Sequence, residues 1–234
     1  MSETLTAPGT TPAPLSRRGF FGRIGAGAAA AGLVFAGCDN DDPDPMPDGV
    51  VLDFSDDFGV LNYAYALEQL EYGFYEAVMA GGYFQGLAAD SEERRVLLDL
   101  RDHELAHVDF FSTALGNEAI GDLVPDFSAI DFDSRTSVLA TAQTFEDLGV
   151  AAYNGAGQYL TNVDFLLVAG KIVSVEARHA AAIRGLFQSS PTAFAGDDVV
   201  DPATGLDRAF TPSTVLAAAG DFVATPIMLT NVPS

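Results

Sequence analysis

The chain of 234 residues is poor in cysteine, histidine and basic residues, with one Cys, three His and 11 Lys and Arg against 33 Asp and Glu. A single cysteine excludes an intramolecular disulfide and a site built on several thiolates. The formal net charge of −22 would repel a phosphate backbone, which excludes nucleic acid as a partner. Most acids are aspartates, 23 against 10 glutamates, and these predict a solvated, strongly soluble surface.

The sequence also lacks an apolar run long enough to span a bilayer near its N-terminus. The weakly apolar stretch at 24–37 has 14 residues, whereas a membrane-spanning helix needs about 20. The motif SRRGFF at 16–21 precedes it and matches the twin-arginine pattern. We therefore predict that residues 1–37 are a Tat signal peptide and that the mature protein is exported to the periplasm or cell envelope.

The one cysteine stands at the end of this segment. The sequence FAGC at 35–38 resembles a bacterial lipobox, although Phe35 stands where Leu is usual. A lipidated Cys38 would anchor the protein to a membrane without a transmembrane helix; the alternative is a stray cysteine at an ordinary cleavage site. Residues 38–54 follow as an acidic, Pro-rich tether with too few apolar side chains to fold. Removing residues 1–37 leaves 8 basic (11 − 3) and 32 acidic (33 − 1) residues, a net charge of −24.

A Glu-x-x-His motif occurs twice, as Glu104 with His107 and as Glu176 with His179. Residues three apart on a helix share one face, so both side chains of a pair can reach the same metal ion. With ten glutamates in 234 residues, the chance of a Glu three positions before a given His is about 4 %. Two such pairs from three histidines therefore indicate a function.

Upstream of each pair lies another glutamate, with a tyrosine seven residues after it. Glu68 and Tyr75 precede the first pair, and Glu146 and Tyr153 precede the second. The chain thus reads as two copies of one unit, a helix with a Glu and then a helix with Glu-x-x-His. Glu71 is the rival of Glu68, but only Glu68 aligns with Glu146 through the shared seven-residue step.

The segments LEQLEYGFY (67–75) and EARHAAAIRGLF (176–187) resemble ferritin-like four-helix-bundle proteins, in the branch that includes desiccation-related proteins. The resemblance implies an all-α fold over 55–190, with two antiparallel helix hairpins joined by a long crossover. A C-terminal extension at 191–234 would add a short helix.

Apolar periodicity and capping signals place these helices along the chain. We expect helices over 57–80, 91–115, 134–160 and 161–187, a crossover over 116–133, and a short helix from Thr211 to about Val223 with Pro212 at its first position. Capping boxes are predicted at Asp90 with Glu93 and at Thr161 with Asp164. An 18-residue crossover extends to about 60 Å, enough to follow a helix of about 38 Å.

Four carboxylates facing one core would each be costly to bury and would raise one another's pKa values, and two divalent cations remove that cost. The predicted metal ligands are Glu68, Glu104, His107, Glu146, Glu176 and His179. Carboxylates with one imidazole per metal suit two iron ions, or alternatively two manganese ions. His103 is expected to make an outer or surface contact, and Tyr75 is a candidate catalytic residue as an electron donor or else a core residue.

The resemblance to ferritins implies a di-iron centre that oxidises Fe²⁺ or consumes O₂ or peroxide, in defence against oxidative or desiccation stress. One alternative is a manganese catalase, although these usually carry one carboxylate fewer than the set found here. Another is a non-catalytic metal-binding or structural stress protein of the cell envelope. Because the Tat pathway carries folded proteins, a metal centre could be assembled before export.

Overall fold

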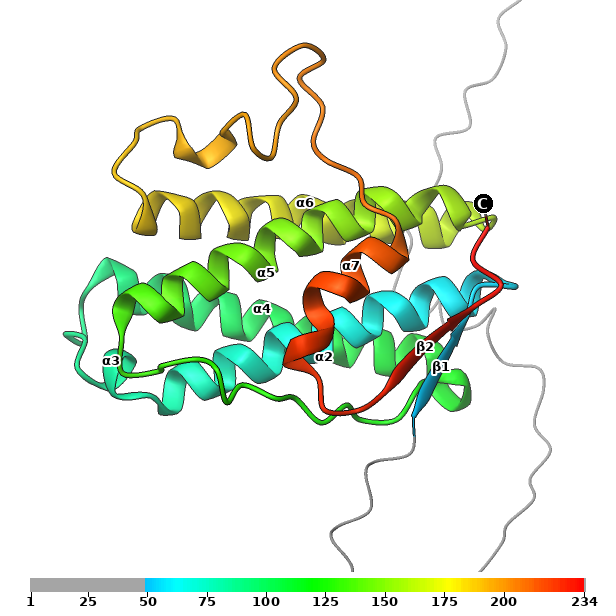
Figure 1. Cartoon of the computed structure of the whole chain (residues 1–234), viewed down its shortest axis with the longest axis horizontal. Helices are drawn as coiled ribbons and strands as arrows, with labels where there is room; N and C mark the ends of the chain where they lie inside the picture. Colours follow the sequence, from blue (N-terminus) through cyan, green and yellow to red (C-terminus); the bar gives the residue numbers. More distant parts are fainter. Residues whose placement is uncertain (1–48, 234) are drawn as a thin grey trace, which may run out of the picture. The chain divides into compact units, whose positions relative to one another are not determined.

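The computed structural model describes residues 49–233, so the predicted signal peptide, Cys38 and most of the predicted tether lie outside the described residues. Four long helices dominate the described part: α2 (Asp57–Ala80), α4 (Glu92–Leu115), α5 (Arg135–Ala156) and α6 (Val163–Phe187). Helix α2 pairs with α4, and α5 pairs with α6, as two hairpins (Figure 1). The all-α bundle predicted from the sequence is confirmed. None of the helices in 49–233 combines the length and apolar character needed to cross a membrane.

The hairpins are joined by the predicted crossover, which follows α2 along its length (Figure 1). It begins with the 3-10 turn η1 (Gly116–Glu118). The side chain of Asn62 donates to the carbonyl of Glu118 at 2.7 Å and accepts from the amide of Ile120 at 2.8 Å. Past the other end of α2, the amide of Tyr83, in the short helix α3 (Gly82–Gln85), donates to the carbonyl of Phe132 at 3.2 Å.

Two predicted capping boxes are wrong by one residue. Ser91, whose backbone is extended, caps α4 by accepting from the amide of Arg94, so Asp90 lies before the cap. Asn162 caps α6 by accepting from the amide of Asp164 at 2.9 Å. Thr161 cannot serve there, because its amide and hydroxyl both donate to Asp57. Both errors arise because several adjacent residues were chemically able to cap.

Two segment ends also differ from the prediction. Helix α5 ends at Ala156 and continues as the 3-10 turn η2 (Gly157–Tyr159), rather than as α-helix to residue 160. Helix α7 (Pro212–Ala219) has Thr211 as N-cap and Pro212 at its start as predicted, and then tightens into η4 (Gly220–Phe222).

A two-stranded parallel sheet, which the sequence analysis did not predict, joins the beginning and end of the described chain. Strand β1 (Val50–Asp53) lies within the range assigned to the tether, and it pairs with β2 (Ile227–Thr230). The register runs from Val50 opposite Ile227 to Asp53 opposite Thr230. These four-residue strands flank the bundle beside α2 (Figure 1).

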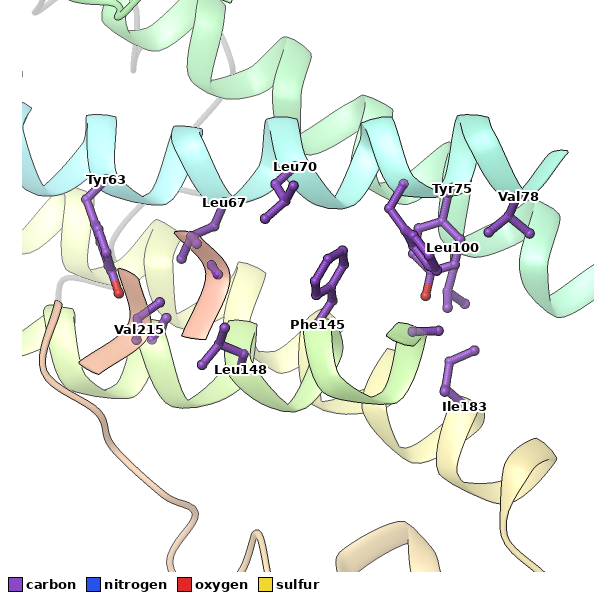
Figure 2. Packing of buried hydrophobic residues seen from close by; sticks show 14 of the residues in the cluster. Tyr63, Leu67, Leu70, Tyr75, Val78, Leu100, Phe145, Leu148, Ile183 and Val215 are labelled. Carbon is purple, nitrogen blue, oxygen red and sulfur yellow. The ribbon is translucent and has the colours of Figure 1, made fainter. Parts of the chain in front are cut away.

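The apolar core fills the space between α2, α5 and α7. Figure 2 shows Leu67 and Leu70 of α2 pointing toward Leu148 of α5 and Val215 of α7, beside Phe145 of α5. Val215 is fully buried, so the C-terminal helix belongs to the same core as the bundle. Burying such side chains contributes about 1.5–3 kcal/mol each.

The segment after α6 is tied to the bundle by one buried arginine. Arg184 of α6 is 2 % exposed and donates through two nitrogens to Asp147 of α5, at 2.8 and 2.6 Å. It also donates to Asp198 at 2.6 Å and to the carbonyl of Ala193, in the 3-10 turn η3 (Ala193–Ala195), at 3.2 Å. A guanidinium with five fixed donors suits this arrangement of several acceptors.

Candidate metal centre

All six predicted ligands lie on the long helices and face one another inside the bundle. They come from α2 (Glu68), α4 (Glu104, His107), α5 (Glu146) and α6 (Glu176, His179). The four glutamates have no exposed surface and His179 is 3 % exposed. Three-residue spacing on α4 and on α6 places each glutamate and histidine on one face, as the sequence predicted.

The first group gathers around Nδ1 of His107. This nitrogen lies 3.0 Å from Oε2 of Glu68, 3.0 Å from Oε1 of Glu176 and 3.3 Å from Oε2 of Glu104. These four atoms lie within 4.8 Å of one another. Three carboxylate oxygens and one imidazole nitrogen thus converge from three helices.

The second group gathers in the same way around Nδ1 of His179. This nitrogen lies 2.8 Å from Oε1 of Glu104, 3.2 Å from Oε2 of Glu176 and 3.5 Å from Oε2 of Glu146. Glu104 and Glu176 each give one oxygen to each group, whereas Glu68 and Glu146 each belong to one group. The two groups therefore lie side by side and share two carboxylates.

Protein hydrogen bonds alone do not satisfy these oxygens. An imidazole Nδ1 carries at most one hydrogen, so it cannot serve three carboxylate oxygens. Three buried oxygens, Oε1 of Glu104, Oε2 of Glu146 and Oε1 of Glu176, have no hydrogen-bond partner. Unpaired buried carboxylate oxygens are costly, and cations between them would remove that cost. The residues therefore fit a metal-binding site made of carboxylate oxygens and imidazole nitrogens.

The electrostatics of the groups agree with this fit. Burial raises the pKa of Glu104 to about 8 and also raises the pKa of Glu146. Burial lowers the pKa of His107, but the carboxylates of Glu104, Glu176 and Glu68 around it outweigh that effect and raise the pKa to about 12. The carboxylates thus create a negative field at the imidazoles, which favours any cation placed there.

A family model described as a ferritin-like domain matches residues 56–189, more than half of the chain. The chain belongs to the ferritin-like domain family. No curated protein matches it at a significant level. The matched range begins one residue before α2 and ends two residues after α6, so it contains the whole bundle and all six candidate ligands.

Two buried tyrosines of the ferritin-like domain each bond to a carboxylate of the opposite hairpin. Tyr75 on α2 donates to Oε1 of Glu146 on α5 at 2.5 Å, and Tyr153 on α5 donates to Oε1 of Glu68 on α2. Burial raises the pKa of both phenols well above 10, so both stay protonated and act as donors. From the sequence only Tyr75 was a candidate catalytic residue, although the shared seven-residue step gives Tyr153 the matching position.

Glu71, the rival of Glu68, lies close to this centre but in neither group. Burial raises its pKa well above 4.5, and its Oε2 has no hydrogen-bond partner. Its Oε1 occupies space beside Gly149 of α5, where an added Cβ would come within 2.8 Å. Gly149 is three residues after Glu146, as Glu71 is three after Glu68, so the second half has no matching carboxyl.

His103 lies outside both groups and contacts one of the histidines. Its ring lies edge to edge with that of His179, with centroids 5.1 Å apart and planes 7° apart, and its Nδ1 lies 2.9 Å from Nε2 of His179. Partial burial and the neighbouring imidazoles lower the pKa of His103. The outer contact expected from the sequence is therefore with a candidate ligand of this ferritin-like domain.

Proposed function

We propose that this ferritin-like protein binds a dinuclear iron centre and uses it to oxidise Fe²⁺ or to consume O₂ or peroxide. The observation that supports this most strongly is the convergence of three carboxylate oxygens on each imidazole Nδ1, with two glutamates shared between the groups. Glu104 and Glu176 would bridge the ions, while Glu68 with His107 and Glu146 with His179 would complete one position each. Paired iron supplies reversible one-electron chemistry at each ion.

The residues around the ions have separate tasks. The two phenols orient the outer carboxylates, because each holds one oxygen of Glu68 or Glu146 and leaves the other free to face a cation. Full burial of the four glutamates excludes bulk water from the carboxylates, which strengthens their attraction for cations. His107, whose side chain is 13 % exposed, is the most exposed of the six candidate ligands.

The alternative is that the same site holds two manganese ions and acts as a catalase. The donor atoms suit either metal, so the reaction that the protein catalyses has to distinguish the two proposals. We would load the full chain with either metal and measure Fe²⁺ oxidation, peroxide consumption and O₂ release, with Glu176→Ala as the variant that loses a bridging carboxylate. Iron-dependent oxidation lost in Glu176→Ala supports the proposal. O₂ release from peroxide by the manganese form alone would support the catalase instead.

We also propose that the protein works outside the cytoplasm in stress defence, after Tat export and lipid attachment at Cys38. The support is the motif at 16–21 and the FAGC sequence at 35–38. Replacing Arg17 and Arg18 together with lysine should keep the protein in the cytoplasm. Replacing Cys38 with alanine should leave export intact and release the protein from membranes. Fractionation with labelled fatty acid measures both, and an unlabelled wild type in the soluble periplasm would refute the lipid anchor.

A third reading, a non-catalytic metal-binding or structural protein of the envelope, predicts a different result. A bundle that binds metal or remains stable without it, and that oxidises neither Fe²⁺ nor peroxide in any metal form, would support that reading.

A further inference from the structure

His103 and His179 form a contact between α4 and α6 at the edge of the candidate centre. His179 is 3 % exposed, whereas His103 lies on the exposed surface of α4. The facing atoms are Nε2 of His179 and Nδ1 of His103, 2.9 Å apart. The buried imidazole is thereby linked to solvent through a second imidazole.

The direction of this hydrogen bond follows from the other nitrogen of His179. Its Nδ1 faces the carboxylate oxygens of Glu104, Glu176 and Glu146 at 2.8–3.5 Å. To bind a cation there, Nδ1 must offer its lone pair, so the single hydrogen of the neutral ring has to be on Nε2. Nε2–H of His179 then donates to Nδ1 of His103, which keeps its own hydrogen on the solvent side.

The other histidine of the centre has no such partner. In the part of the chain that the structure describes, the hydrogen bonds of His107 all run through Nδ1. Its side chain is 13 % exposed. The two halves supply matching carboxylates and matching tyrosines, yet within residues 49–233 only His179 has a protein group that contacts its second ring nitrogen.

We propose that His103 is a positioning residue, which holds His179 in the tautomer and ring orientation that metal binding requires. The inference rests on the proposed dinuclear centre and concerns one of its two positions. Partners of the second nitrogen of a ligating histidine generally change metal affinity by about 10–100-fold. Loss of His103 therefore lowers the affinity for the ion beside His179 and leaves the affinity for the ion beside His107 unchanged.

The test is a Mn²⁺ titration of the metal-free full-length chain, with free Mn²⁺ followed by its electron paramagnetic resonance signal. His103→Leu keeps an apolar side chain of similar reach but has no acceptor, whereas His103→Asn offers Oδ1 in place of Nδ1. Ser112→Leu places a leucine elsewhere on the exposed surface of α4 and serves as the control. Circular dichroism checks that all variants remain folded. We expect them to fold, because both substituted positions are exposed.

We expect His103→Leu to lower the affinity for one of the two Mn²⁺ ions about 10–100-fold. His103→Asn and Ser112→Leu should bind both ions with the affinities of the wild type. A His103→Leu chain with unchanged affinities would overturn the role of His103. Equal losses in His103→Leu and His103→Asn would also overturn it, because contact with the imidazole ring rather than an accepted hydrogen bond would then matter. A folded wild type that binds no metal would instead overturn the dinuclear centre itself.

Discussion

The crossed tyrosines allow a sharp test of how the outer carboxylates are held. Tyr75→Phe removes only the hydroxyl that donates to Oε1 of Glu146 at 2.5 Å and leaves the buried ring in place. Tyr153→Phe does the same for Oε1 of Glu68. The two variants are therefore matched controls for each other, one in each half of the bundle.

The magnitude follows from the type of bond that is lost. Neither variant creates a large cavity, so the cost is that of a hydrogen bond to a charged group, about 1.5–3 kcal/mol. Each variant should lower the unfolding free energy of the metal-free chain by this amount, measured by denaturant titration with circular dichroism. Each should still bind two ions per chain, because the six ligands of the two groups are untouched.

Two outcomes would refute this reasoning. The first is an unfolding free energy of metal-free Tyr75→Phe within about 0.5 kcal/mol of the wild type, which is the range of ordinary surface substitutions. The phenol would then not be holding Glu146. A rate of Fe²⁺ oxidation lowered in Tyr75→Phe but not in Tyr153→Phe would contradict the equivalence of the two tyrosines and assign Tyr75 the role of electron donor.

Other residues give further predictions. Glu104→Ala should lower bound metal well below two ions per chain by elemental analysis, because Glu104 serves both groups, whereas Glu71→Ala should not; equal retention would refute the choice of ligands. Arg184→Met should cost about 3 kcal/mol in denaturant unfolding, because it leaves Asp147, whose side chain is 17 % exposed, without its partner. Asp198→Asn should cost less than about 1 kcal/mol, because that side chain is 63 % exposed; equal losses would contradict this. Metal affinity should rise with pH through and above about 8, with release of protons, because Glu104, whose pKa burial raises to about 8, and His107, whose pKa the surrounding carboxylates raise to about 12, must each lose a proton to bind; a pH-independent titration would refute it.

The sequence was sufficient for the bundle and for the site because both depend on spacing along helices. Apolar periodicity gave α2 and the end of α6 to the residue. The repeated Glu-x-x-His and the upstream glutamates identified all the side chains that meet in the two groups. Helical geometry converts such spacing directly into a shared face, so little tertiary information was needed.

What the sequence did not predict depends on contacts between distant segments. The pairing of β1 with β2 joins residues 50–53 to 227–230, and neither short strand has a pattern of its own. The choice of Asn162 as cap over Thr161 follows from the contact of Thr161 with Asp57. The crossing of each tyrosine to the other hairpin, and the contact of His103 with His179, likewise depend on how the helices face one another.

The most direct test of the account is the metal content of the mature protein purified from its native envelope, measured by elemental analysis against protein concentration. The account predicts about two ions per chain, iron in the first instance, shared between the groups around His107 and His179. Two manganese ions would keep the dinuclear centre and change its chemistry. A folded chain that carries no metal, and takes up none when iron or manganese is supplied, would contradict the central claim.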